Sequence, residues 1–124
     1  MMVAAAPKRL LLLIRHSPYG SSLARASLDV ALAAAAFDQP VTLLFAGDGV
    51  LQLLPEQDTH ARGVKNIGRL LASLPLYGIE QVYVDAQAVA HYQFALDTAP
   101  LKAVPLDSGQ ISEMFRNHDQ LLGF

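Results

Sequence analysis

Few residue types in this chain could do chemistry, and the most informative ones lie in one short stretch. Val41–Phe45 is an apolar run typical of a buried strand, and Gly47-Asp48-Gly49 interrupts it. A second apolar run, Val50 to Leu54, follows at once, and Pro55 closes it. Loops normally run over the surface and are polar, so something must cover these apolar residues.

Asp85 is a second carboxylate in a position of interest. It follows the strand expected at Gln81–Val84 and precedes a short helix expected from Ala86 to about Tyr92. A carboxylate at this point is well placed to cap the helix and to interact favourably with its dipole. A general base would need a partner that the sequence does not identify, so we favour capping.

Other motifs exclude more chemistry than they suggest. The chain has no cysteine, so it offers no disulfide, thiolate zinc site, thiol nucleophile or persulfide carrier. Neither GxGxxG, GxxxxGK[ST] nor GxSxG occurs. The loop from Arg15 to Ser22 could hold an anion, but an ordinary turn with Ser21 or Ser22 near a helix N-cap is the favoured interpretation.

The histidines do not suggest a metal site. No pair has metal-ligand spacing on one helix, and only His16 follows the carboxyl end of a strand, where sites of α/β proteins usually form. We therefore expect structural or solvent-facing roles, no catalytic residue, no metal and no cofactor. The four are His16, His60, His91 and His118.

Composition predicts one domain over residues 1–124 and argues against nucleic-acid binding. The net charge is −2, which gives no electrostatic signature for direct contact with nucleic acid. Charged residues make up only 16% and hydrophobic residues 52%, which indicates either a surface hidden against other subunits or a small domain with a large core. Lys8 and Arg9 follow the small residues at the start, so no secretory signal is expected. No apolar run reaches about 18 residues without a charge, so we expect a cytoplasmic protein that does not cross a membrane.

Strands alternate with helices along the chain. This order predicts a parallel sheet covered on both faces. Asp107 and Gln110 have the spacing of a capping box for a helix with Ile111, Met114 and Phe115 on one face. The strands are expected at residues 10–14, 41–45, 81–84, 101–104 and 121–124, and the longer helices at 23–37 and 62–74.

The segment Asp48-Gly49-Val50 with Gln52-Leu53-Leu54-Pro55 resembles the signature of the DsrE-like sulfur-relay family, in its TusC/DsrF branch. The DGVxQLLP segment is the most specific part of the resemblance. Supporting matches extend over nearly the whole chain: Pro18, Gly20, Leu28-Asp29, Leu76-Tyr77, Ile79-Glu80-Gln81, Asp119, Leu122 and Phe124.

The resemblance implies a three-layer α/β/α sandwich with a mainly parallel, five-stranded sheet. It also implies a non-catalytic subunit of a cytoplasmic heterohexamer, built from two copies each of TusB-, TusC- and TusD-like chains. Such a complex passes persulfide sulfur, through a TusE-like carrier and a tRNA-thiolating enzyme, toward 2-thiolation of the wobble uridine. The sulfur-carrying cysteine of the TusD-like chain corresponds to Asp85 here. Val50, Leu51, Gln52, Leu53 and Leu54 become interface candidates, exposed on a lone subunit and covered in the complex.

Two alternatives stay open at this point. Within the family, the chain could be the DsrF-like subunit of a sulfur-oxidation complex. Outside it, the chain could be a stand-alone α/β module that binds a small molecule or an anion with the loops after its first two strands. The sequence also leaves self-association of the isolated chain open.

Overall fold

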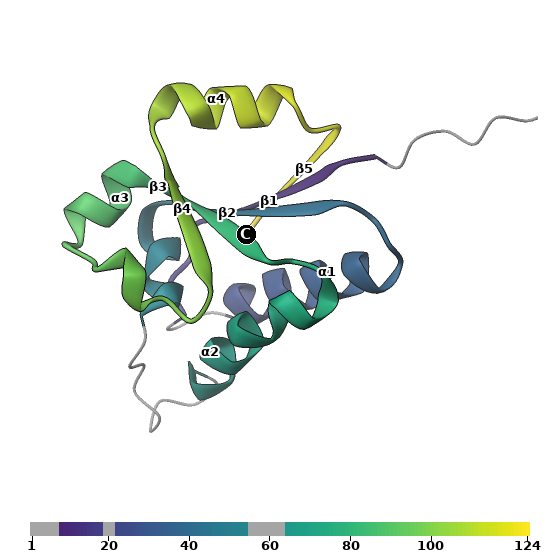
Figure 1. Cartoon of the computed structure of the whole chain (residues 1–124), viewed down its shortest axis with the longest axis horizontal. Helices are drawn as coiled ribbons and strands as arrows, with labels where there is room; N and C mark the ends of the chain where they lie inside the picture. Colours follow the sequence, from purple (N-terminus) through teal and green to yellow (C-terminus); the bar gives the residue numbers. More distant parts are fainter. Residues whose placement is uncertain (1–7, 19–21, 55–63) are drawn as a thin grey trace, which may run out of the picture.

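Five short strands form one parallel sheet in the computed structural model, which describes residues 8–18, 22–54 and 64–124 (Figure 1). The order across the sheet is β4-β3-β2-β1-β5, and all four neighbouring pairs are parallel. This confirms the predicted α/β class and five-stranded sheet. The strands are β1 (Leu10–Ile14), β2 (Val41–Phe45), β3 (Gln81–Asp85), β4 (Lys102–Leu106) and β5 (Gln120–Gly123).

The helices follow the predicted order, with small differences at their ends. α1 stops one residue earlier than expected, before a turn in which Asp38 has a φ of 57°. The predicted start of the second helix, at Arg62, lies outside the described residues. The helices are α1 (Leu23–Ala36), α2 (Val64–Ser73), α3 (Ala86–His91) and α4 (Ser108–Arg116), with 3-10 helices η1 (Gly47–Leu53), η2 (Leu74–Tyr77) and η3 (Leu96–Thr98).

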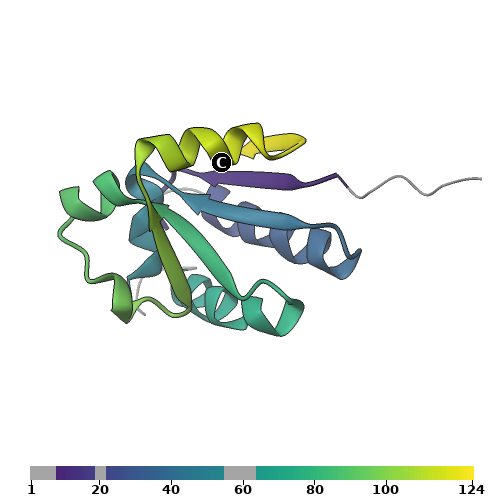
Figure 2. The same ribbon diagram turned by 45° about the horizontal axis from the view of Figure 1, so that its top comes forward.

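The helices form a layer on each side of the sheet, and the two layers are unequal. α1 and α2 lie side by side on one face, whereas α4 lies over the other (Figures 1 and 2). The larger core joins Leu12, Leu43 and Val82 of the sheet to Leu28 of α1 and Leu71 of α2. Since side chains alternate between the faces of a strand, residues next to these in sequence form the opposite core.

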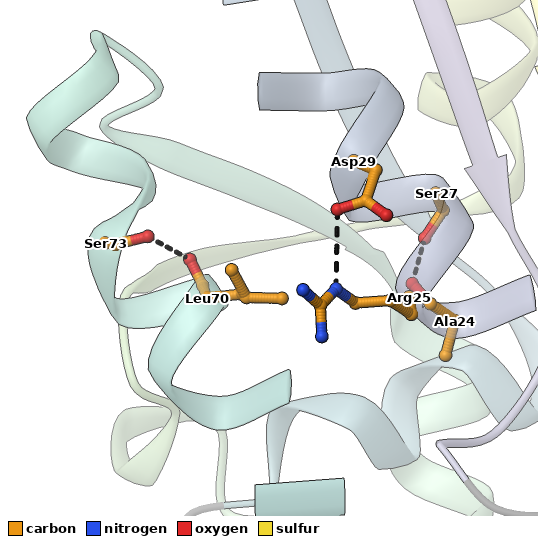
Figure 3. A network of polar contacts seen from close by, with 6 residues as sticks. All are labelled: Ala24, Arg25, Ser27, Asp29, Leu70 and Ser73. Carbon is orange, nitrogen blue, oxygen red and sulfur yellow. Dashed lines mark hydrogen bonds and ion pairs between the residues drawn. The ribbon is translucent and has the colours of Figure 1, made fainter. Parts of the chain in front are cut away.

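Two serines fit into the helical layer by hydrogen-bonding to their own helices (Figure 3). The hydroxyl of Ser27, fully buried in α1, donates to the carbonyl of Ala24 at 2.8 Å. The hydroxyl of Ser73 donates to the carbonyl of Leu70 at 2.7 Å in α2. A buried hydroxyl without a partner is costly, and these bonds remove that cost without interrupting the apolar contact between the helices.

α4 covers a smaller core. Leu11 and Leu44 are buried beneath it, and Ile111 and Met114 pack against them, whereas Phe115 is 39% exposed. The predicted capping box is confirmed at its start. The backbone amide of Gln110 donates to the carboxylate of Asp107, and the backbone amide of Asp107 donates to the side-chain oxygen of Gln110. This box orients α4 as the chain leaves β4.

His118 holds the other end of α4 to the sheet. Its Nδ1 lies 2.7 Å from the carbonyl oxygen of Met114, and its Nε2 lies 3.0 Å from the hydroxyl of Thr42 in β2. These contacts give His118 a structural role, which is one of the two roles expected for the histidines. Among the residues described, no helix is both long and apolar enough to span a membrane.

Candidate functional site

The predicted site residues lie at the carboxyl edge of the sheet, where β1, β2 and β3 end. Parallel strands bring these ends together, and ligand sites of α/β folds usually form there. After β2 the chain enters η1, which contains most of the DGVxQLLP segment, and after β3 it enters α3. The residues named from the sequence therefore share one edge, although they are separated along the chain.

Gly49 occupies a tight position at this edge. A Cβ atom there would lie 2.0 Å from the carbonyl oxygen of Ile14, at the end of β1. The same carbonyl accepts a hydrogen bond of 2.9 Å from the amide of Ala46, and the carbonyl of Ala46 accepts one of 2.9 Å from the amide of Gly49. Only glycine allows the backbone of η1 to come this close to β1.

Gln52 ties η1 to the loop after β1. Its side chain is fully buried, and its Nε2 donates to the carbonyl oxygen of His16 at 2.8 Å. His16 itself is exposed, as expected for a solvent-facing histidine. The amide of Arg15, the residue before it, donates to the carbonyl of Phe124 at 2.7 Å. The loop after β1 is thus held from two sides.

The prediction that Val50 to Leu54 forms an exposed patch is wrong for three of the five residues. Val50, Gln52 and Leu53 are buried in the subunit's own core, and only Leu51 and Leu54 are partly exposed. The physical reason is that η1 turns the segment back over the end of the sheet. Its apolar side chains then reach the core shared with α1 and α2.

Asp48 faces a residue that the sequence did not single out. The hydroxyl of Tyr92, at the end of α3, donates to the carboxylate of Asp48. This hydrogen bond, together with desolvation and the charge of Asp48, raises the pKa of Tyr92 above its ordinary value. The ring of His91 packs edge-on against that of Tyr92, with centroids 4.8 Å apart. No local signal predicted the pair, because its members are 44 residues apart.

Asp85 caps α3, as predicted. Its carboxylate accepts a hydrogen bond of 2.9 Å from the amide of Gln87, two residues into the helix. Among the residues described, no cluster of three or more acidic residues or histidines could hold a metal ion. His60 lies outside these residues, as does part of the predicted anion loop, residues 19–21. The carboxylates of Asp48 and Asp85 and the side-chain amide of Gln52 each hydrogen-bond to a loop or helix of the chain.

Replacing Gly49 with alanine should destabilise the fold. The added Cβ would overlap the Ile14 carbonyl, so the backbone must shift, at a cost of about 1–3 kcal/mol in the free energy of unfolding. The matched control is Gly68→Ala in α2, where the added Cβ meets nothing within 4 Å beyond its chain neighbours and its own helix backbone, and alanine should stabilise by about 0.5–1 kcal/mol. Urea unfolding measures both; equal effects would contradict the close approach.

Leu53→Asp should unfold the chain, because it places a charge in a fully buried position. Leu51→Asp, on the partly exposed side of the same helix, should leave the fold intact. Circular dichroism with thermal melting separates the two. A folded Leu53→Asp variant with an unchanged melting temperature would show that Leu53 is accessible in the lone subunit.

Tyr92→Phe should change the dependence of stability on pH. Because its pKa is raised in the folded state, the hydrogen bond to Asp48 contributes fully below the unfolded value of about 10, and its contribution falls as pH rises through the folded value. The stability difference between wild type and Tyr92→Phe should therefore be constant near neutral pH and narrow above pH 10. Urea unfolding across this range measures it, with Tyr77→Phe on η2 as the control. A constant difference would refute the pairing.

Comparisons of the sequence with known proteins identify the family of this chain. The model of the DsrE/DsrF-like family matches residues 8–124. A protein named TusC homolog from Pseudomonas aeruginosa is 34% identical over 113 residues, covering 91% of this chain and 95% of that protein. The intracellular sulfur oxidation protein DsrF of Allochromatium vinosum is 32% identical, covering 94% and 96%.

A solved structure shows the same fold. The ychN protein from E. coli superposes with a TM-score of 0.77, covering 94% of this chain and 99% of that one, at 18% sequence identity. The family match over almost the whole chain confirms the resemblance seen in the DGVxQLLP segment. The chain is a TusC-like or DsrF-like member of the DsrE/DsrF-like family.

Proposed function

We propose that this chain is a non-catalytic subunit of a cytoplasmic sulfur-relay complex, assembled with TusB-like and TusD-like chains. The observation that carries the proposal is the last residue of β3, which is also the N-cap of α3. Asp85 stands where the related TusD-like chain is expected to carry its reactive cysteine, and the Asp85 carboxylate is used to cap α3. With no cysteine in the chain, the persulfide must reside on a sister chain.

The role left to this chain is to hold its sisters in place. Its carboxyl edge is braced by the Gln52–His16 and Asp48–Tyr92 hydrogen bonds. Leu51 and Leu54, which stay partly exposed beside this edge, remain our candidates for contact with a sister chain. In this proposal the complex hands sulfur to a TusE-like carrier, for 2-thiolation of the tRNA wobble uridine.

A DsrF-like role is the second candidate, because the Allochromatium vinosum protein is almost as similar as the TusC homologs. It would place the same structural subunit in a sulfur-oxidation complex. A stand-alone anion-binding module is less favoured. The loops after β1 and β2 use backbone and side-chain groups to hold each other, through Gln52 and the carbonyl groups of Ile14 and His16.

Mass spectrometry of the co-expressed complex tests the proposal. The chain, carrying an affinity tag, is produced with TusB- and TusD-like chains, purified through the tag and treated with a persulfide donor. We expect the sister chains to co-purify and the TusD-like chain to gain one sulfur atom, while this chain keeps its unmodified mass. A stable sulfur adduct on this chain would contradict the proposal, as would failure of the sister chains to co-purify.

Asp85→Cys is the matched control. It restores a thiol at the start of α3, where the helix N-terminus favours the thiolate. This variant should gain a sulfur adduct under the same conditions, which would show that the donor reaches that position. Supplying either TusE-like or sulfur-oxidation acceptor proteins to the loaded complex distinguishes the TusC-like from the DsrF-like role.

A further inference from the structure

The two outermost strands of the sheet, β4 and β5, form its lateral edges, and they differ in how readily another strand could pair with them. The β4 edge exposes Lys102 and Pro105, a charge and a residue without an amide hydrogen, both of which discourage pairing. β5 at the other edge, Gln120–Gly123, contains neither a charged residue nor a proline. No residue of β5 itself therefore supplies these protective features, and the nearby charge is the guanidinium of Arg15, 3.5 Å from where a Cβ of Gly123 would lie.

Within the described part of the chain, no backbone group pairs with the outer side of β5. The amides of Gln120 and Phe124 donate to the carbonyl groups of Arg9 and Leu13, at 3.2 and 2.8 Å, so they point inward toward β1. Amides alternate in direction along a strand, so those of Leu121 and Gly123 point outward. Among the residues that the structure describes, β5 pairs with β1 alone, which leaves this outer row open to another strand.

An apolar groove runs beside the same edge, between β5 and the second half of α1. Its volume is about 730 Å³, and its polar side chains, Gln39 and Gln120, are uncharged. Phe37 is 86% exposed at the groove, and Leu121 and Leu122 are 52% and 45% exposed. The apolar lining consists chiefly of Leu10, Val30, Ala33, Ala34, Phe37 and Leu122.

We propose that β5 of one copy of this chain pairs antiparallel with β5 of a second copy, about a two-fold axis. The occupant is a second copy because an antiparallel pair of identical strands is self-complementary and closes after two chains. Pairing β5 with β4 of another copy would instead propagate, and Lys102 and Pro105 oppose it. The two sheets would then form one continuous sheet.

The outward-pointing amides of Leu121 and Gly123 determine the register of this strand pair. Placing Leu121 opposite Gly123 of the second copy brings both outward amides of each strand into the ladder. Leu122 then lies opposite its own counterpart, on the face that carries α1. A four-residue strand alone buries too little surface for a stable dimer, so the groove and Phe37 must contribute the remaining contact. The inference goes beyond the proposed function, since only this chain takes part.

Sedimentation velocity of the purified full-length chain, with circular dichroism as the check on folding, tests the proposal. The wild type should sediment at twice the mass of the chain. Leu122→Lys places a charge opposite a like charge, and Leu121→Pro removes an outward amide that β1 does not use. Both should stay folded and weaken association at least about tenfold. Leu76→Lys is the matched control, because Leu76 is 85% exposed on η2 and does not line the groove; this variant should remain dimeric.

Hydrogen exchange locates the contact. In the wild type the amides of Leu121 and Gly123 should be protected, and in Leu122→Lys they should exchange at least about tenfold faster, while that of Phe124 stays protected by Leu13. A monomeric wild type, a dimer that survives both variants, or rapid exchange of these amides in the wild type would each overturn the proposal. So would protection that appears only when a sister chain is added, because that would assign the edge to a different partner.

Discussion

The backbone of Gly49 lies against the carbonyl oxygen of Ile14, in a space that would not admit a Cβ atom. This close contact lets η1, which begins at Gly47, turn back over the ends of β1 and β2. Once it does so, Val50 and Leu53 enter the core, and Gln52 reaches the carbonyl of His16. The packing of α1 and α2 around that core, and the position of the loop after β1, therefore depend on one glycine.

The carboxyl edge of the sheet has the geometry of a ligand site, but both of its carboxylates are engaged in hydrogen bonds within the chain. Two carboxylates stand where α/β proteins usually place functional side chains, but Asp48 accepts the hydroxyl of Tyr92 and Asp85 accepts the amide of Gln87. The first bond joins η1 to the end of α3, and the second caps the start of α3, so both carboxylates stabilise the arrangement of these helices. In our proposal the edge serves as rigid support, with sulfur chemistry on a sister chain.

The sheet is asymmetric in two directions, and both asymmetries bear on assembly. One face carries α1 and α2 over a large core, whereas the other carries α4 over a small core with Phe115 partly exposed. One edge is protected by Lys102 and Pro105, whereas β5 at the other edge has neither feature. For a chain with only 16% charged residues, these differences indicate which surfaces are suited to contact with other subunits.

The sequence by itself determined the elements and their local ends. The apolar runs at Leu10–Ile14 and Val41–Phe45 became strands, and Asp85 and the Asp107–Gln110 pair capped helices as predicted, because caps and periodicity depend on neighbouring residues. Tertiary structure alone decided whether Val50–Leu54 faced outward or inward and which partner Asp48 found. The Gln52–His16 and Asp48–Tyr92 contacts join residues 36 and 44 positions apart, and only packing of the whole sheet brings such residues together.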